Sequence, residues 1–170
     1  MALDKLAASL LDILREERAI YQTLLEKAAE KKDAIIKDDV EALTAITRFE
    51  EEAVLAIRKT DKAKEKILQE MAPIMHQAEP PDLSEIIQGV KDGALKADLS
   101  NIQVEFQSII NGLSAQNMVN QQLLETQLEY TNFCLELLTQ PESVGDFYGS
   151  SGQVADPNSE IRRNFIDTKI

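Results

Sequence analysis

The chain lacks tryptophan and has only one histidine and one cysteine. The lone cysteine, Cys134, cannot close an internal disulfide, which agrees with a reducing compartment. The lone histidine excludes the di-iron helical bundles, because those sites need two Glu-x-x-His pairs. Any Ser-His-Asp or Cys-His site would depend on His76, which lies among prolines. We interpret His76 as a solvated loop residue and expect the chain not to be an enzyme.

Glycine is also scarce, because none precedes Gly89 and the patterns G-x-x-x-x-G-K and G-x-G-x-x-G do not occur. The sequence therefore contains no phosphate-binding loop of the nucleotide-binding type. Its carboxylates are spread along solvated faces instead of converging with other polar residues. We predict no catalytic residues, no metal ligands and no cofactor, and we interpret Met71 and Met75 as apolar packing residues.

Basic residues are outnumbered, with 18 Lys and Arg against 30 Asp and Glu and a formal net charge of −12. Such a charge repels a phosphate backbone and an anionic membrane surface. No stretch approaches the roughly 18 consecutive apolar residues that a membrane span needs. The first residues carry charges in an amphipathic pattern, which is not typical of a signal peptide. We expect a cytoplasmic protein that binds no nucleic acid and does not insert into membranes.

The first 72 residues contain neither glycine nor proline, which favours long helices. Apolar residues there recur in steps of three and four and form an apolar stripe on each arm, and only Glu17 interrupts the stripe of the first arm. The stripe of the first arm contains Leu3, Leu6, Leu10, Ile13, Ile20 and Leu24. That of the second arm contains Val40, Leu43, Ile46, Val54, Ile57, either Ile67 or Leu68, and Met71. A charged stretch from Arg58 to Lys66 thins it. We predict an antiparallel helical hairpin over residues 1–72.

The turn between the two arms is predicted at Lys37-Asp38-Asp39. Asp38 and Glu41 have the spacing of an acidic variant of the capping box, which predicts that the second helix begins just after Asp38. Pro73 is expected to end that helix. Asp82 and Glu85 have the same cap spacing and predict a short helix that ends before Lys91.

The final long helix is predicted over residues about 94–140. Its apolar stripe is the most regular in the chain and contains Leu95, Leu99, Ile102, Phe106, Ile109 and Leu113. The next stripe positions are Gln116 and Asn120, with Asn117 beside them, before Leu123 and Leu124 resume the pattern. Two interpretations stay open for these amides: an internal polar layer that sets register, or a surface that accepts another chain's backbone.

After Pro141 the composition shifts to glycine, serine and proline, which predicts a flexible tail. The tail nevertheless carries Phe147 and Tyr148, and Ile161, Phe165, Ile166 and Ile170 recur at helix-compatible spacing. It could be a cloning remnant, it could pack on its own domain, or it could bind a partner. We favour folding upon a partner. The predicted fold is all-α, with a coiled-coil-like helical bundle in residues 1–140 and a flexible tail in residues 141–170.

Several runs resemble the FlgN-type flagellar export chaperones. The run Lys31–Leu43 resembles that family's turn between its first two helices, and Glu50–Leu55 is similar to the run that follows. Gln116–Leu124 resembles the family's paired asparagines ahead of a leucine pair, and Tyr148–Gln153 resembles its Tyr-Gly, Gly-Gln element. Late in the second helix the family often has an arginine, where this chain has lysines at positions 62, 64 and 66.

The resemblance implies a chaperone that holds the hook-filament junction proteins FlgK and FlgL as unassembled subunits and delivers them to the flagellar type III export apparatus. It places client binding on the late final helix and the tail. The implied client-binding residues are Asn117, Asn120, Leu123, Leu124, Tyr148, Ile161, Phe165 and Ile166. Leucines and aromatics would bury apolar surface, and asparagines would bond the client's backbone. The alternative is a structural coiled-coil protein whose stripes serve self-association or scaffolding.

Overall fold

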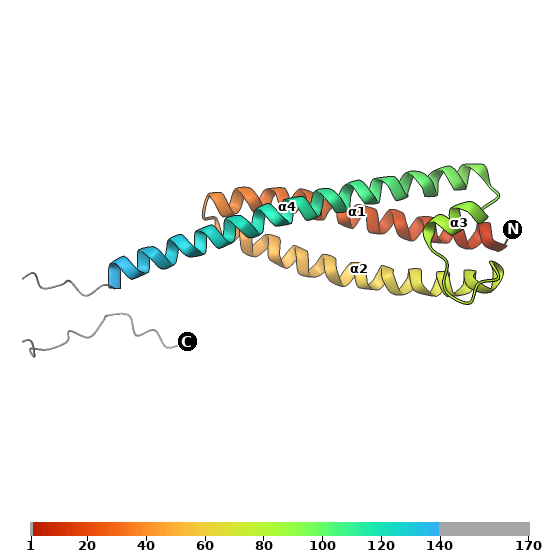
Figure 1. Ribbon diagram of the computed structural model, residues 1–170, viewed down its shortest axis with the longest axis horizontal. Helices are drawn as coiled ribbons and strands as arrows, with labels where there is room; N and C mark the ends of the chain where they lie inside the picture. The colour runs from red at the N-terminus through yellow and green to blue at the C-terminus, as the bar shows by residue number, and fades with distance from the viewer. Residues whose placement is uncertain (1, 140–170) are drawn as a thin grey trace, which may run out of the picture. The chain divides into compact units, whose positions relative to one another are not determined.

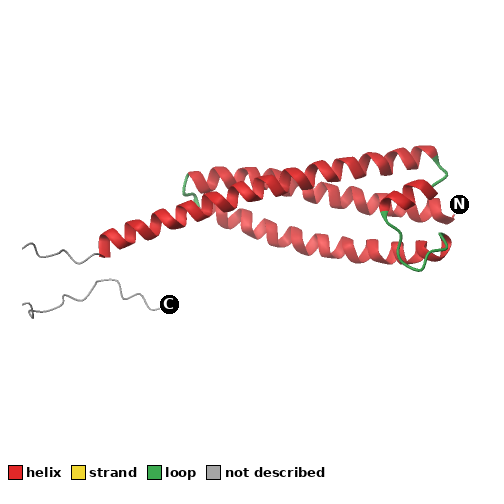
Figure 2. Cartoon of the chain, viewed as in Figure 1, coloured by secondary structure: helices red, strands yellow, loops and turns green. Residues whose placement is uncertain are grey.

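The computed structural model describes residues 2–139, and every regular element within that range is a helix (Figures 1 and 2). The helices are α1 (Ala2–Ile36), α2 (Val40–Ile74), α3 (Leu83–Gly89) and α4 (Gly93–Thr139). The predicted all-α fold, with a long hairpin, a short helix and a long final helix, is confirmed. The predicted tail lies outside the described residues. The chain divides into two compact units, Met1–Leu124 and Glu125–Ile170.

In the first unit, α1 is the helix on which the others pack. The helices α1 and α2 each have 35 residues, so each is about 50 Å long, and they run antiparallel side by side (Figure 1). The helix α4 contacts α1 through side chains, including an edge-to-face pair of Tyr21 and Phe106 with ring centroids 5.8 Å apart. Ion pairs join Arg15 to Asp98 and Arg18 to Glu105.

The apolar core gathers at the end of the first unit where α3 lies. All four helices contribute to it, and Val90 adds to it from the loop after α3. The core cluster consists of Ala7, Leu10, Leu11, Leu14, Met71, Ile86, Val90, Leu99 and Ile102. Leu10, Leu99 and Ile102 are stripe residues, so the periodic pattern identified part of this core correctly. Burial of a large apolar side chain stabilises the fold by about 1.5–3 kcal/mol, so this end of the unit is its most stable part.

The turn between α1 and α2 corrects the predicted cap by one residue. Asp38 has a φ of 53°, its N–H donates to the Ile35 carbonyl, and the Asp39 N–H donates to the Ala34 carbonyl. This is the Schellman motif that ends α1, with Asp38 at its left-handed position. Asp39, not Asp38, is the N-cap of α2, because its carboxylate accepts from the Ala42 N–H at 2.9 Å.

The end of α2 repeats that geometry and corrects a second expectation. Pro73 does not end the helix but lies in its last turn, because the helical φ suits proline and only one backbone hydrogen bond is lost there. The helix ends in a second Schellman motif, with His76 at the left-handed position with a φ of 56°. The His76 N–H donates to the Pro73 carbonyl, and the Gln77 N–H donates to the Ala72 carbonyl. His76 is exposed, as predicted for a solvated loop residue.

The caps of the remaining helices agree with their sequence patterns. Asp82 and Glu85 form the predicted capping box, in which the carboxylate of each residue accepts from the backbone N–H of the other. The Asp92 carboxylate accepts from the N–H groups of Ala94 and Leu95 and so begins α4. The described helices include none that is both long and apolar enough to cross a bilayer.

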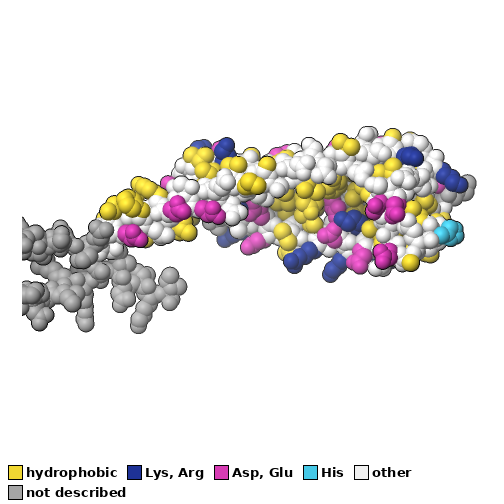
Figure 3. Space-filling model, viewed as in Figure 1, with side chains coloured by type: hydrophobic (Ala, Val, Ile, Leu, Met, Phe, Trp, Pro, Cys, Tyr) yellow, Lys and Arg dark blue, Asp and Glu magenta, His cyan; other side chains and the backbone are white. Residues whose placement is uncertain are grey.

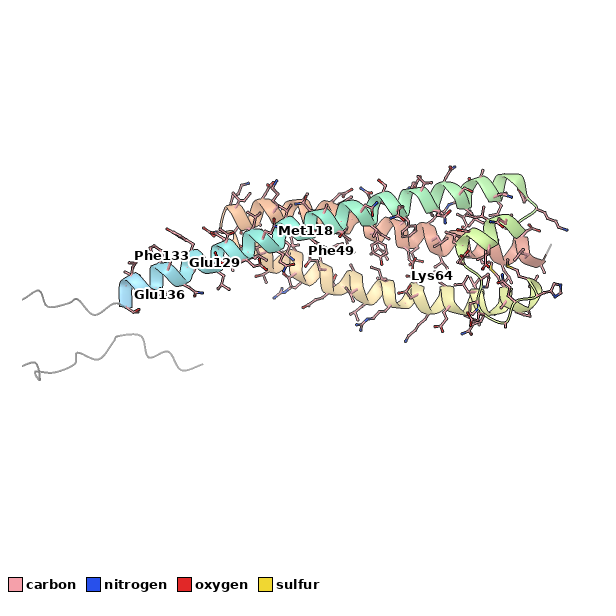
Figure 4. All side chains as sticks on the ribbon, viewed as in Figure 1. Phe49, Lys64, Met118, Glu129, Phe133 and Glu136 are labelled. Carbon is pink, nitrogen blue, oxygen red and sulfur yellow. The ribbon has the colours of Figure 1, made fainter. Side chains whose placement is uncertain are left out.

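The residue that interrupts the stripe of α1 is buried and has a half-buried cationic partner on α2. Glu17 is 2% exposed, and its carboxylate lies 2.9 Å from Lys64 Nζ and 3.1 Å from the Thr60 hydroxyl (Figure 4). Burial lowers the pKa of Lys64, but hydrogen bonds to the Asp61 and Glu17 carboxylates outweigh it and raise that pKa above its ordinary value. Lys64 is therefore charged at neutral pH, and the stability that its charge contributes is lost as the pH rises through the raised Lys64 pKa.

His76→Gly should raise the free energy of unfolding by about 1 kcal/mol, because glycine adopts the left-handed conformation without strain from a Cβ atom. Urea denaturation followed by circular dichroism measures this change. His76→Ala is the matched control, since it removes the imidazole but keeps the Cβ atom, and it should leave stability nearly unchanged. Equal effects of the two substitutions would show that backbone strain at this position is not the cause.

Lys64→Met should lower the free energy of unfolding by about 3 kcal/mol, because it leaves the Glu17 carboxylate buried without its cation. The double variant Glu17→Leu with Lys64→Met should recover wild-type stability or exceed it, since it restores an unbroken apolar stripe. Arg15→Met is the control, because its partner Asp98 is about half exposed and the loss should stay below about 1 kcal/mol. A double variant as unstable as the single one would contradict the expectation.

Candidate binding surface on the final helix

The stripe of α4 changes from apolar to polar halfway along the helix, and the structure keeps both parts facing inward. Leu99, Ile102 and Ile109 are buried, and the next fully buried residue of α4 in the described range is Asn120. Gln116, one turn before it, is half-buried. The predicted continuation of the stripe through the two amides is therefore correct.

Asn120 is held against α1 by one hydrogen bond. The side chain is 3% exposed, and its Nδ2 donates to the Ala28 carbonyl at 2.8 Å. Asn120 Oδ1 and Gln116 Nε2 are both buried and have no hydrogen-bond partner among the described residues. A buried polar group without a partner costs about 1–3 kcal/mol. The sequence left open whether these amides form an internal polar layer or bind another chain's backbone. In this conformation Asn120 belongs to an internal polar layer, because it bonds Ala28 of the same chain.

Gly112 lies two turns before Asn120 and contacts α1 at Leu25. A Cβ atom added to Gly112 would lie 3.4 Å from both δ-methyl carbons of Leu25, which is an ordinary van der Waals distance. Glycine within a helix costs about 1 kcal/mol relative to alanine. At Gly112, just before the polar layer, α4 therefore has a low intrinsic helix propensity and lies close to α1.

The predicted client-binding residues fall into three groups. Asn117 is exposed and Leu124 is 43% exposed, so a partner can reach both. Leu123 is half-buried and Asn120 is buried, so the first unit itself covers these two. Tyr148, Ile161, Phe165 and Ile166 lie outside the described residues.

The structure adds exposed apolar residues that were not among the predicted site residues. In the first unit these include Met118 and Val119, which are 61% and 39% exposed. In the described part of the second unit they are Leu128, Tyr130, Phe133, Leu135, Leu137 and Leu138 (Figures 3 and 4). At 3.6 residues per turn they lie around most of the helix, and we call this surface the exposed apolar face. The signal was present in the sequence, because large apolar residues surround a narrow strip of Glu125, Glu129 and Glu136.

The chemistry of this region is that of binding through apolar contact. A contiguous group of exposed large apolar side chains on a soluble domain marks an interaction site. Residues 2–139 contain no group of three or more His, Cys, Asp or Glu side chains that could hold a metal ion. Cys134 is half-buried beside this face and is a free thiol.

A family model described as FlgN protein matches residues 1–156 of the chain, a range that includes all four helices. No curated protein and no solved structure matches the chain.

Asn120→Leu should leave the free energy of unfolding unchanged or raise it by about 1 kcal/mol, because it removes a buried amide whose oxygen has no partner. The Ala28 carbonyl loses a side-chain donor but keeps its place in the helical hydrogen-bond ladder of α1. Thermal and urea unfolding measure the effect. Asn117→Leu is the exposed control and should change stability by less than about 0.5 kcal/mol. A large loss with Asn120→Leu alone would show that the amide is an essential part of an internal network.

Proposed function

The chain belongs to the FlgN family of flagellar export chaperones, and on that premise we propose that it binds hook-filament junction proteins of the FlgK and FlgL class before they assemble. It holds these subunits in the cytoplasm and delivers them to the flagellar type III export apparatus. The family match over residues 1–156 supports the general role. The observation that supports client binding by α4 is the exposed apolar face of that helix.

The exposed apolar face suits an amphipathic helix as its ligand. Leu128 is 62% exposed, Tyr130 is 64% exposed and Leu138 is 82% exposed. A helix that lays its apolar side on these residues removes both surfaces from water, at about 25 cal/mol for each Å² of apolar area buried. The family resemblance implies that the clients have long amphipathic terminal helices that need such a partner before assembly. The Glu125, Glu129 and Glu136 carboxylates beside the face would favour a client helix with basic flanks.

Within this proposal the predicted site residues have different roles. Leu123 and Leu124 extend the apolar contact, and the exposed Asn117 amide is available to the client's polar groups. Asn120 contributes only where α4 separates from α1, because it is buried in the free protein. The tail residues Tyr148, Ile161, Phe165 and Ile166 are proposed to add apolar contacts to the client or to the export apparatus.

Self-association through the same face is the alternative function. The face spans residues 128–138, so it is about 16 Å long at 1.5 Å per residue, and the side of a helix that one partner covers is about 10 Å wide. A stable dimer usually buries about 800 Å² on each partner, which is well above what such a strip supplies by itself. This estimate favours a client, which can also contact other parts of the chaperone, over a second copy of this helix.

Leu128→Glu and Leu138→Glu should each weaken binding of a purified FlgK-class junction protein at least tenfold, because each places a charge within an apolar interface. Isothermal titration calorimetry measures the affinity. Both side chains are exposed in the free chaperone, so the melting temperature should stay within about 2 °C of the wild type.

Val104→Glu is the matched control, because Val104 is 70% exposed on the same helix but lies outside the exposed apolar face. It should bind the junction protein like the wild type. No binding by the wild type, together with a stable homo-oligomer in light scattering, would favour the structural coiled-coil alternative. Equal weakening by all three substitutions would place the client elsewhere.

A further inference from the structure

The contact between α1 and α4 in the first unit is uneven along its length. Near α3 the contact contains Leu99 and Ile102 of the core cluster, and two ion pairs flank it. Beyond Ile109, the fully buried α4 residue in the described range is the polar Asn120. That half of the contact depends on half-buried apolar side chains such as Leu113 and Leu123 and on the bond from Asn120 to Ala28. Because little apolar surface is buried there, this segment is the part of α4 that opens most easily.

The two amides in that segment leave a donor and an acceptor without partners. Gln116 Nε2 is a buried donor and Asn120 Oδ1 is a buried acceptor, and neither has a hydrogen-bond partner among the described residues. Residues four apart on a helix lie on the same face, so this donor and acceptor are neighbours. An amide group offers the complementary acceptor and donor. While α4 lies against α1, Gln116 Nε2 and Asn120 Oδ1 make no hydrogen bond, so both could bond a ligand.

We propose that α4 from Gly112 to Leu124 separates from α1 when the client binds, and that Gln116 and Asn120 then bond an amide group of the client. The pair is thus a hidden binding site, covered by α1 in the free chaperone. This inference rests on the proposed function and adds a conformational step to it.

Gly112 gives the opening a defined starting point. It lacks a side chain, it lies one turn before Gln116, and its backbone lies close to the Leu25 methyl groups of α1. A helix bends most readily at such a residue, because glycine has the greatest backbone freedom. The core cluster lies toward α3 from this point, so the segment from Gly112 to Leu124 can separate while that cluster stays closed.

A reversible cross-link between α1 and α4 tests the inference directly. The variant carries Leu25→Cys and Gly112→Cys, with Cys134→Ser to remove the native thiol. A Cβ atom at position 112 would lie 3.4 Å from the Leu25 methyl carbons, so the side chains of the two positions meet. Loss of free thiol after oxidation confirms that the disulfide has formed before binding is measured. The oxidised protein should bind a FlgK-class junction protein at least tenfold more weakly than the same protein after reduction. Calorimetry on both forms measures the difference.

The oxidised and reduced forms have the same sequence, so a difference in binding between them comes from the cross-link and not from the substitutions. Binding of equal strength by the oxidised and reduced forms would overturn the opening step. Absence of binding by both the reduced variant and the wild type would instead contradict the proposed function. Gly112→Cys with Cys134→Ser, treated with oxidant in the same way, controls for effects of oxidation without a cross-link.

Amide exchange supplies an independent measurement on the unmodified protein, whether or not the disulfide forms. Addition of the junction protein should speed exchange in α1 around Leu25 and Ala28, because α4 no longer covers that stretch. Slower or unchanged exchange there in a saturated complex would overturn the proposal, since the contact between α1 and α4 would then stay closed.

Discussion

The packing of two long helices on α1 is the constraint on which the first unit depends. α1 contacts α2 along one side through the ion pair of the buried Glu17 with the half-buried Lys64, and it contacts α4 through Tyr21, Leu25 and Ala28. One helix has a limited apolar circumference, so it cannot present a wide apolar stripe to both partners over its whole length. The core cluster lies at the end near α3, whereas farther along α1 buries Ala34 and Ile35 and contacts α4 through the bond from Asn120 to Ala28.

This division has a consequence for stability. The core cluster combines α1, α2, α3 and α4 at one end, where burial of apolar surface provides most of the favourable free energy. At the other end, Asn120 has one hydrogen bond to Ala28 and one oxygen without a partner. A polar layer fixes the register of two helices when all of its donors and acceptors have hydrogen-bond partners. When some lack partners, as here, less free energy is needed to separate α4 from α1. The stable end and the adaptable end of the unit therefore have different chemistry, although the same helices form both.

The proposed binding surface is a part of α4 where large apolar residues continue along the helix but are no longer buried. From Leu128 to Leu138 the helix has the large apolar residues of a packed interface, yet these side chains are exposed in the described part of the second unit. Exposed apolar area is costly in water, so its presence over several turns is best explained by a partner. Together with the FlgN family membership, this supports the proposed capture of amphipathic client helices.

The sequence by itself determined the helices, their approximate limits and part of the core, because three-four periodicity, capping residues and missing helix breakers act over a few neighbouring residues. Val40 and Val54, which it also placed on a stripe, are exposed. It predicted that Gln116 and Asn120 continue the stripe, but it left open what they would face. Only the tertiary structure decided that Asn120 bonds Ala28, that Glu17 finds Lys64, and that Asp39 instead of Asp38 caps α2. The first two depend on partners 92 and 47 residues away in the chain. The third depends on a left-handed backbone conformation that a cap pattern does not encode.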